Sequence, residues 1–203
     1  MPSRPANAGW GNVKSKLAEL DAAALVALLR DLYQASPENR RFLHGRFLGS
    51  QAEQENYRRL IADAVYPDPL SRNPVRLGEA ERLIRHFQRA TADRAATVDL
   101  MLTFVEAGTE QAAGLGYGDE RYFAALERTL KATVDELPGL PLPVQAEAAE
   151  RVRKLVRRAA VVGWGYGDAV EEIATALPTV TPESARASRA AVAPPRLRRN
   201  VRK

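Results

Sequence analysis

The chain has 203 residues, of which 45% are hydrophobic and 27% are charged, and it contains no cysteine. This composition argues against a fibre, a disulfide scaffold and a membrane protein, and the length suits one ordinary domain or two small ones. A chain of this size can bury enough surface to fold without a metal or a disulfide. The first residues lack the apolar segment of a secretory signal, so we expect a cytoplasmic protein.

The net charge of +5 is concentrated at one end of the chain. Residues 181–203 hold seven basic side chains and one acidic side chain, and the preceding 180 residues carry a net charge of −1. This segment is rich in Pro, Ala and Ser and has few apolar anchors, which predicts a disordered basic tail at 179–203. We expect a flexible N-terminus at 1–11 and a single all-helical domain at 12–178.

Apolar residues recur every three or four positions and nowhere alternate over the length of a strand, which predicts an all-α fold. Asp21, Ser36 (followed by Pro37) and Asp93 stand where the N-caps of three helices are expected. We therefore predict about nine helices, at 12–19, 22–34, 37–48, 51–65, 77–90, 94–113, 119–136, 144–161 and 169–177.

Four of these segments carry an apolar stripe along one helix face, and we expect the stripes to pack against one another in a core. The first stripe contains Leu25, Leu28, Leu29 and Leu32. The other three contain Val98, Met101, Leu102 and Val105; Phe123, Leu126, Leu130, Val134 and Leu137; and Val144, Ala148, Val152, Leu155 and Ala159.

Two glycine-rich segments, GLGYGD at 114–119 and GWGYGD at 163–168, match at five of six positions. We interpret both as helix corners, in which a glycine ends one helix in the left-handed conformation and the aspartate caps the next helix. Asp168 with Glu171 would form a capping box. Paired helices of this kind predict antiparallel hairpins, arranged as a stacked α-hairpin array or an irregular helical bundle. No strand precedes and no lysine follows either segment, which argues against a phosphate-binding loop.

Two acidic pairs suggest a second class of function. Glu147 and Glu150, followed by Asp168 and Glu171, resemble in spacing the paired acidic helices with which all-α nucleotide pyrophosphatases hold magnesium. A metal-dependent nucleotide hydrolase is therefore one alternative. The second pair has the reverse order, however, and the first pair has basic residues four positions away, as in ordinary surface ion pairs.

A basic helix and the tail suggest a third class, association with nucleic acid. The neutral body and the absence of a base-stacking motif argue against a dedicated nucleic-acid binder. The candidate contacts are Arg151, Arg153, Lys154, Arg157, Arg158, Arg196, Arg198, Arg199, Arg202 and Lys203.

The two histidines, His44 and His86, stand in no metal-ligand or catalytic spacing, so we interpret both as structural. The sequence thus predicts no catalytic residue, no metal site and no cofactor. Signals for cores and turns are abundant, and we expect a non-catalytic helical binding or scaffold protein that contacts a protein partner through a helical groove.

The stretch 31–47, DLYQASPENRRFLHGRF, taken with GWGYGD at 163–168, resembles a family of uncharacterised bacterial helical proteins. Members of this family share a D-L-Y-x-x-S-P-E-N opening and a late G-W-G-aromatic turn before the last helix. The resemblance covers about residues 13–178 and implies a bacterial cytoplasmic helical protein. It implies no activity and no catalytic residues.

Overall fold

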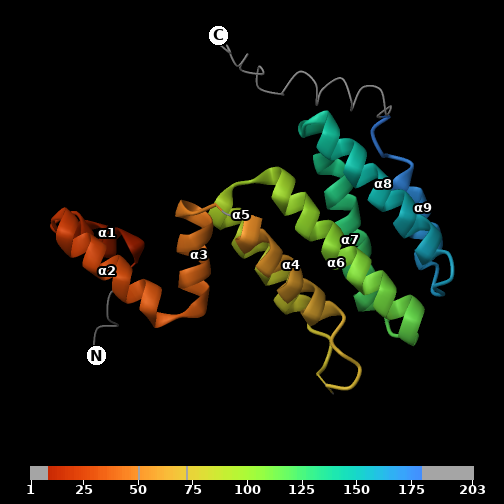
Figure 1. Ribbon diagram of the computed structural model, residues 1–203, viewed down its shortest axis with the longest axis horizontal. Helices are drawn as coiled ribbons and strands as arrows, with labels where there is room; N and C mark the ends of the chain where they lie inside the picture. Colours follow the sequence, from red (N-terminus) through yellow and green to blue (C-terminus); the bar gives the residue numbers. More distant parts are fainter. Residues whose placement is uncertain (1–8, 50, 72, 180–203) are drawn as a thin grey trace, which may run out of the picture. The chain divides into compact units, whose positions relative to one another are not determined.

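The computed structural model describes residues 9–49, 51–71 and 73–179, and every regular element within these ranges is helical (Figure 1). The predicted all-α fold is confirmed, and each of the nine predicted helices is present in these ranges. The contacts divide the chain into two compact units, 1–50 and 51–203, and the predicted domain at 12–178 spans parts of both. Apart from Thr179, the predicted basic tail lies outside the described residues.

Within the first unit, residues 9–49 form three helices: α1 (Trp10–Leu17), α2 (Ala22–Ala35) and α3 (Pro37–Phe47). The predicted caps are confirmed, because Asp21 accepts a hydrogen bond from the backbone of Ala24 and Ser36 accepts one from Asn39. The predicted burial of the first apolar stripe is wrong. Leu28, Leu29 and Leu32 remain 37%, 43% and 45% exposed, because α2 packs mainly against α3 and no other helix in residues 9–49 covers the stripe.

The described residues of the second unit form six α-helices and a short 3-10 turn: α4 (Gln51–Val65), α5 (Leu77–Thr91), α6 (Arg94–Leu115), α7 (Glu120–Glu136), η1 (Leu137–Gly139), α8 (Leu142–Ala159) and α9 (Tyr166–Ala174). The long helix α6 lies at the centre and packs against α4, α5, α7 and α8, and α9 packs against α7 and α8 (Figure 1). The fold is therefore an irregular bundle of helix hairpins around α6.

The core of the described chain lies in this second unit. The stripes of α6, α7 and α8 are buried as predicted, except that Met101 and Val144 are partly exposed. α6 and α7 approach closely at Gly108, where a Cβ would stand 2.5 Å from Cδ2 of Leu126. Among the helices in the described ranges, none combines the length and the apolar character that crossing a membrane requires.

The corner between α6 and α7 has the predicted geometry. Gly116 is left-handed (φ 65°) and its N–H donates to the carbonyl of Ala112, which ends α6. Gly118 has φ 144°, and Asp119 then caps α7 by accepting a hydrogen bond from the backbone of Tyr122 at 2.8 Å. The ring of Tyr117 lies 5.2 Å from that of Tyr122, edge to face.

The corner between α8 and α9 differs from the prediction. Trp164 and Gly165 are both left-handed, and α9 begins at Tyr166, three residues before the predicted start at 169. Asp168 consequently lies in the first turn of α9 and is not its N-cap, so the predicted capping box with Glu171 is wrong. The next glycine explains the early start, because Gly167 packs so tightly that a Cβ would stand 3.0 Å from the carbonyl oxygen of Ala159.

Candidate protein-binding groove

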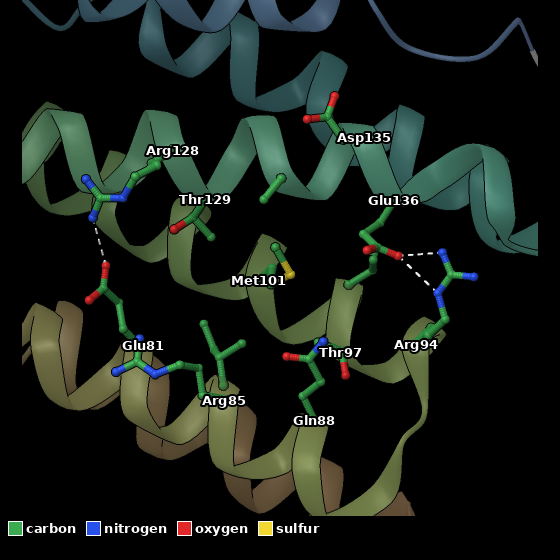
Figure 2. A pocket seen from close by; sticks show the side chains of 13 residues that line it. Glu81, Arg85, Gln88, Arg94, Thr97, Met101, Arg128, Thr129, Asp135 and Glu136 are labelled. Carbon is green, nitrogen blue, oxygen red and sulfur yellow. Dashed lines mark hydrogen bonds and ion pairs between the residues drawn. The ribbon is translucent and has the colours of Figure 1, made fainter.

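A groove of about 500 Å³ runs over α6 between α5 and α7 (Figure 2). Its position follows from the sequence of α6, which is apolar on nearly every side and must pack against helices all around. α5 and α7 both pack on α6, and the groove lies between them. All of its lining residues belong to the second unit.

The floor of the groove is apolar. Ile84 and Val98 are buried beneath it, and Met101 is only partly covered and extends into the opening (Figure 2). Methionine is unbranched and polarisable, and it adapts to differently shaped apolar partners. The floor can therefore accept apolar side chains without requiring one fixed shape.

Two ion pairs border the groove, one toward each end (Figure 2): one joins α6 to the wall formed by α7, and the other joins the two walls, α7 and α5. Nη2 of Arg94 lies 2.5 Å from Oε2 of Glu136, and Nη2 of Arg128 lies 3.1 Å from Oε1 of Glu81. Asp135 and other polar side chains complete the rim. The rim thus carries both signs of charge around an apolar floor, which is the usual arrangement of a protein-binding surface.

The groove lining contains no arrangement that activates a nucleophile. The hydroxyls of Thr97 and Thr129 donate to carbonyls of Asp93 and Ala125, one turn back in their own helices. Nucleophilic catalysis would need a base within hydrogen-bond reach of such a hydroxyl. The remaining polar lining residues are acids, arginines and one glutamine, and each of the two ion pairs holds an acid against an arginine.

A second cluster of charged side chains ties α4, α6 and α8 together. Asp99 accepts hydrogen bonds from Gln54, Arg58 and Arg151 at 2.7, 2.5 and 2.7 Å, and Arg151 also makes a two-pronged contact with Glu106. Burial raises the pKa of Asp99, but the three hydrogen bonds and the charge of Arg151 hold that pKa below its ordinary value. A pocket of about 300 Å³ adjoins this cluster. Because the acids and the arginines satisfy one another, the cluster is a structural clip between helices.

The basic helix α8 is largely neutralised by neighbouring carboxylates. Arg151 and Arg158 pair with acids of α6, and Arg153 pairs with an acid of α8 itself. Lys154 and Arg157 are exposed and have no ion-pair partner among the described residues. The other five predicted nucleic-acid contacts lie outside the described residues: Arg196, Arg198, Arg199, Arg202 and Lys203.

The four carboxylates of the hydrolase alternative do not form one site. Glu147 lines the pocket beside the clip, whereas Asp168 and Glu171 line a separate pocket at the start of α9. Within the described ranges, no group of three or more His, Asp or Glu side chains could hold a metal ion. Glu150 is exposed and lies 3.5 Å from Arg153, as expected for a surface ion pair.

Both histidines make structural contacts with a tyrosine. Nε2 of His44 lies 3.0 Å from the hydroxyl of Tyr33, and Nδ1 of the buried His86 lies 2.5 Å from the hydroxyl of Tyr57. The structural interpretation of both residues stays a prediction.

The sequence analysis expected a helical groove but did not give its position. It assigned Val98 and Met101 to an apolar stripe but gave no sign that Met101 would stay partly open. Glu81 and Arg128 are 47 residues apart, and Arg94 and Glu136 are 42 residues apart, so no spacing rule within a helix could pair them. In the sequence, the only sign of the charged rim was the charged side chains on the helices that flank α6.

The chain matches no protein-family model, no curated protein and no solved structure in the comparisons that we made. The resemblance of 31–47 and 163–168 to a family of bacterial helical proteins therefore stays a prediction.

Proposed function

We propose that this chain is a non-catalytic binding protein whose groove over α6 takes the apolar face of a helix from a protein partner. The observation that carries the proposal is an apolar floor with Met101 at its centre and a rim of both charge signs. We also propose, from the resemblance at 31–47, that it works in a bacterial cytoplasm.

A helix is the partner element that this geometry favours. An amphipathic helix places apolar side chains at intervals of three and four residues, and such a row can follow a groove that runs between two parallel walls. The charges on the walls would then meet polar side chains at the flanks of the partner helix. The apolar floor favours such a partner over a small polar ligand, and the hydroxyls of Thr97 and Thr129 already donate within their own helices.

The test is a selection of helix-forming peptides of about 15 residues from a displayed library, with the full chain as bait. Ala132 is exposed on α7 and lines the groove, so Ala132→Arg should fill it, and Ala124→Arg changes an exposed alanine of α7 outside the groove. We expect the selected peptides to bind Ala132→Arg at least about tenfold more weakly than wild type. Ala124→Arg should bind normally, and equal binding to both variants, or no selected peptide, would overturn the proposal.

Nucleic-acid association is the second candidate, and it depends on Lys154, Arg157 and residues 181–203. Its test is binding to DNA and RNA, single-stranded and duplex, at two salt concentrations, with and without residues 181–203. Contacts to phosphates predict binding that weakens steeply with salt and that is lost with the deletion. Absence of binding at low salt excludes this function.

A further inference from the structure

The groove over α6 has a basic end and an acidic end. Three of its charged lining residues lie toward the start of α5 and the middle of α7, and three lie where α6 begins and α7 ends (Figure 2). The basic end holds two arginines and one acid, and the acidic end holds two acids and one arginine: Arg85, Arg128 and Glu81, and Asp135, Glu136 and Arg94. The formal charge of the lining therefore changes from +1 at one end to −1 at the other.

One charge at each end remains available to a partner, because the two ion pairs that border the groove use the other four. Arg85 is exposed and makes no ion pair with an acid in the described part of the chain. Asp135 has one ion pair among these residues, with Lys131 at 3.4 Å, and both side chains are more than half exposed. An ion pair so open to water is weak, so a charged group of a partner can compete for Asp135.

The directions of the surrounding helices give the groove the same polarity. α5 and α7 run from the basic end to the acidic end, whereas α6 runs from the acidic end to the basic end (Figure 2). The aligned peptide dipoles of a helix place partial positive charge at its start and partial negative charge at its end. A helix laid between α5 and α7 is therefore favoured when it runs against both of them. It would then be parallel to α6 on the diagonal, as in an up-and-down four-helix bundle.

We propose that the partner helix runs parallel to α6, with an acidic side chain in its C-terminal turn beside Arg85 and its N-terminal turn beside Asp135. This assignment rests on the proposed binding of a helix in the groove, and it adds the direction of that helix and the charge of its ends. A carboxylate suits Arg85 because a guanidinium group can bind it through two parallel hydrogen bonds. The last carbonyls of the partner helix would add negative charge at the same place.

The two charged ends also set the length of the contact. Positions 128 and 136 of α7 are eight residues apart, which corresponds to about 12 Å along the helix. About two turns of a partner helix span this distance. Its apolar side chains, at intervals of three or four residues, would face Met101 and the buried floor. The acidic side chain should follow this apolar row toward the C-terminus.

The first test examines the charges of the 15-residue peptides that the full chain selects from the displayed library. We expect Asp or Glu to be enriched in the C-terminal turn and Lys or Arg in the N-terminal turn. The stability of an isolated helix favours the opposite arrangement, with acids at the start and bases at the end. Enrichment of that opposite arrangement, or of neither, would overturn the proposed direction.

The second test removes the charge of Arg85, with one selected peptide as the probe. At low salt, Arg85→Gln should bind this peptide about two- to fivefold more weakly than wild type, and the difference should shrink at high salt. Arg82 is also exposed on α5 but does not line the groove, so Arg82→Gln should bind like wild type. Equal binding by Arg85→Gln and wild type would contradict the proposed pairing.

The third test measures the direction of the bound peptide. The chain contains no cysteine, so Ala124→Cys and Pro138→Cys each supply one thiol for a nitroxide label, at exposed positions beyond the basic end and beyond the acidic end. The nitroxide at position 138 should quench a fluorophore on the N-terminus of the peptide, and the nitroxide at position 124 should quench one on its C-terminus. The reverse pattern, or equal quenching from both positions, would show that the proposed direction is wrong.

Failure of this inference differs from failure of the proposed function. If no peptide is selected, or if Ala132→Arg leaves peptide binding unchanged, the groove does not take a helix and both proposals are wrong. If Ala132→Arg weakens binding but the charges or the direction disagree, only the present inference is wrong. Ala132→Arg should leave the oligomeric state of the full chain unchanged in sedimentation velocity. A wild-type dimer that this variant abolishes would place a second copy in the groove and exclude a separate partner.

Discussion

The corner between α6 and α7 keeps its tyrosine close to the surface, whereas the corner between α8 and α9 buries the equivalent tyrosine completely. Tyr117 is 45% exposed, and Tyr166 is 0% exposed with its hydroxyl 2.7 Å from that of Thr109 on α6. The ring of Tyr166 also lies 5.0 Å from that of Phe123 on α7. One corner is a surface turn, and the other supplies a side chain to the core.

The difference comes from what surrounds each segment. At the first corner α6 continues to Leu115, and Gly118, with φ 144°, cannot be helical, so α7 begins only after Asp119. At the second corner α8 ends at Ala159, and Gly167 lets α9 start early against the backbone of α8. Five identical residues of six thus give two backbone paths. The third residue, Gly116 or Gly165, is left-handed at both corners, but the fifth residue is outside a helix at Gly118 and within α9 at Gly167.

The largest expected effect separates the two tyrosines directly. Tyr166→Ala removes a fully buried aromatic side chain and should lower the free energy of unfolding by about 3–5 kcal/mol. Tyr117→Ala should cost less than about 1 kcal/mol, because its ring is half exposed. Urea unfolding followed by circular dichroism measures both. Equal losses of unfolding free energy in the two variants would mean that both tyrosines stabilise the fold equally.

The glycines that follow the tyrosines should also differ. Gly118→Ala forces a side chain into a backbone conformation with φ 144° and places a Cβ 2.6 Å from Cζ of Phe123, so we expect a loss of about 2–3 kcal/mol. Gly167→Ala should cost about 1 kcal/mol or less, because the gain in helix propensity offsets a tight contact at 3.0 Å. Thermal melts resolve this difference, since about 1 kcal/mol corresponds to roughly 2–4 °C.

Alkaline pH should destabilise the core around the second corner. Burial raises the pKa of Tyr122 and Tyr166 well above the ordinary value. Because the folded pKa is raised, this contribution to stability is fully present below about pH 10 and is lost as pH rises through the folded pKa, by up to about 1.4 kcal/mol per pH unit for each tyrosine. Urea unfolding at pH 9 to 11 measures the slope. Tyr166→Phe should reduce this slope of unfolding free energy against pH. An unchanged slope in this variant would mean that groups other than Tyr166 cause the loss of stability.

The smallest difference concerns the two aspartates. Asp119→Ala removes the N-cap of α7 and should cost about 1 kcal/mol. Asp168→Ala removes only a charge in the first turn of α9, so its effect should be about 0.3–0.5 kcal/mol and should vanish at high salt. Urea titrations of both variants at low and high salt provide the check. A larger loss for Asp168→Ala would restore the capping box that the sequence predicts.

The helices could be predicted because their signals are local. The apolar spacing of α6 to α8 and the caps at Asp21, Ser36 and Asp93 all lie within a few residues of the features they determine. Eight of the nine predicted starts agree with the structure within about two residues. The start of α9 failed, because Gly167 acts through its contact with α8, which local spacing does not reveal.

The position of the groove and the division into two units were not predictable from the same signals. An apolar stripe shows that a helix face needs a partner, but it does not say whether the partner is in the same unit. The stripe of α2 and the stripe of α7 look alike in the sequence, yet Leu29 is 43% exposed and Leu130 is fully buried. The difference arises from the number of helices that surround each stripe.

The positions of the two tryptophans have a practical consequence for optical work on this protein. Trp10 is 69% exposed and Trp164 is 78% exposed, so the indole emission of the native state should already be red-shifted and open to quenching by acrylamide. Unfolding should change that emission little. The core chromophores are tyrosines, with Tyr57, Tyr122 and Tyr166 all buried. Trp164, on its left-handed backbone, is instead a local reporter for the path of the chain between α8 and α9.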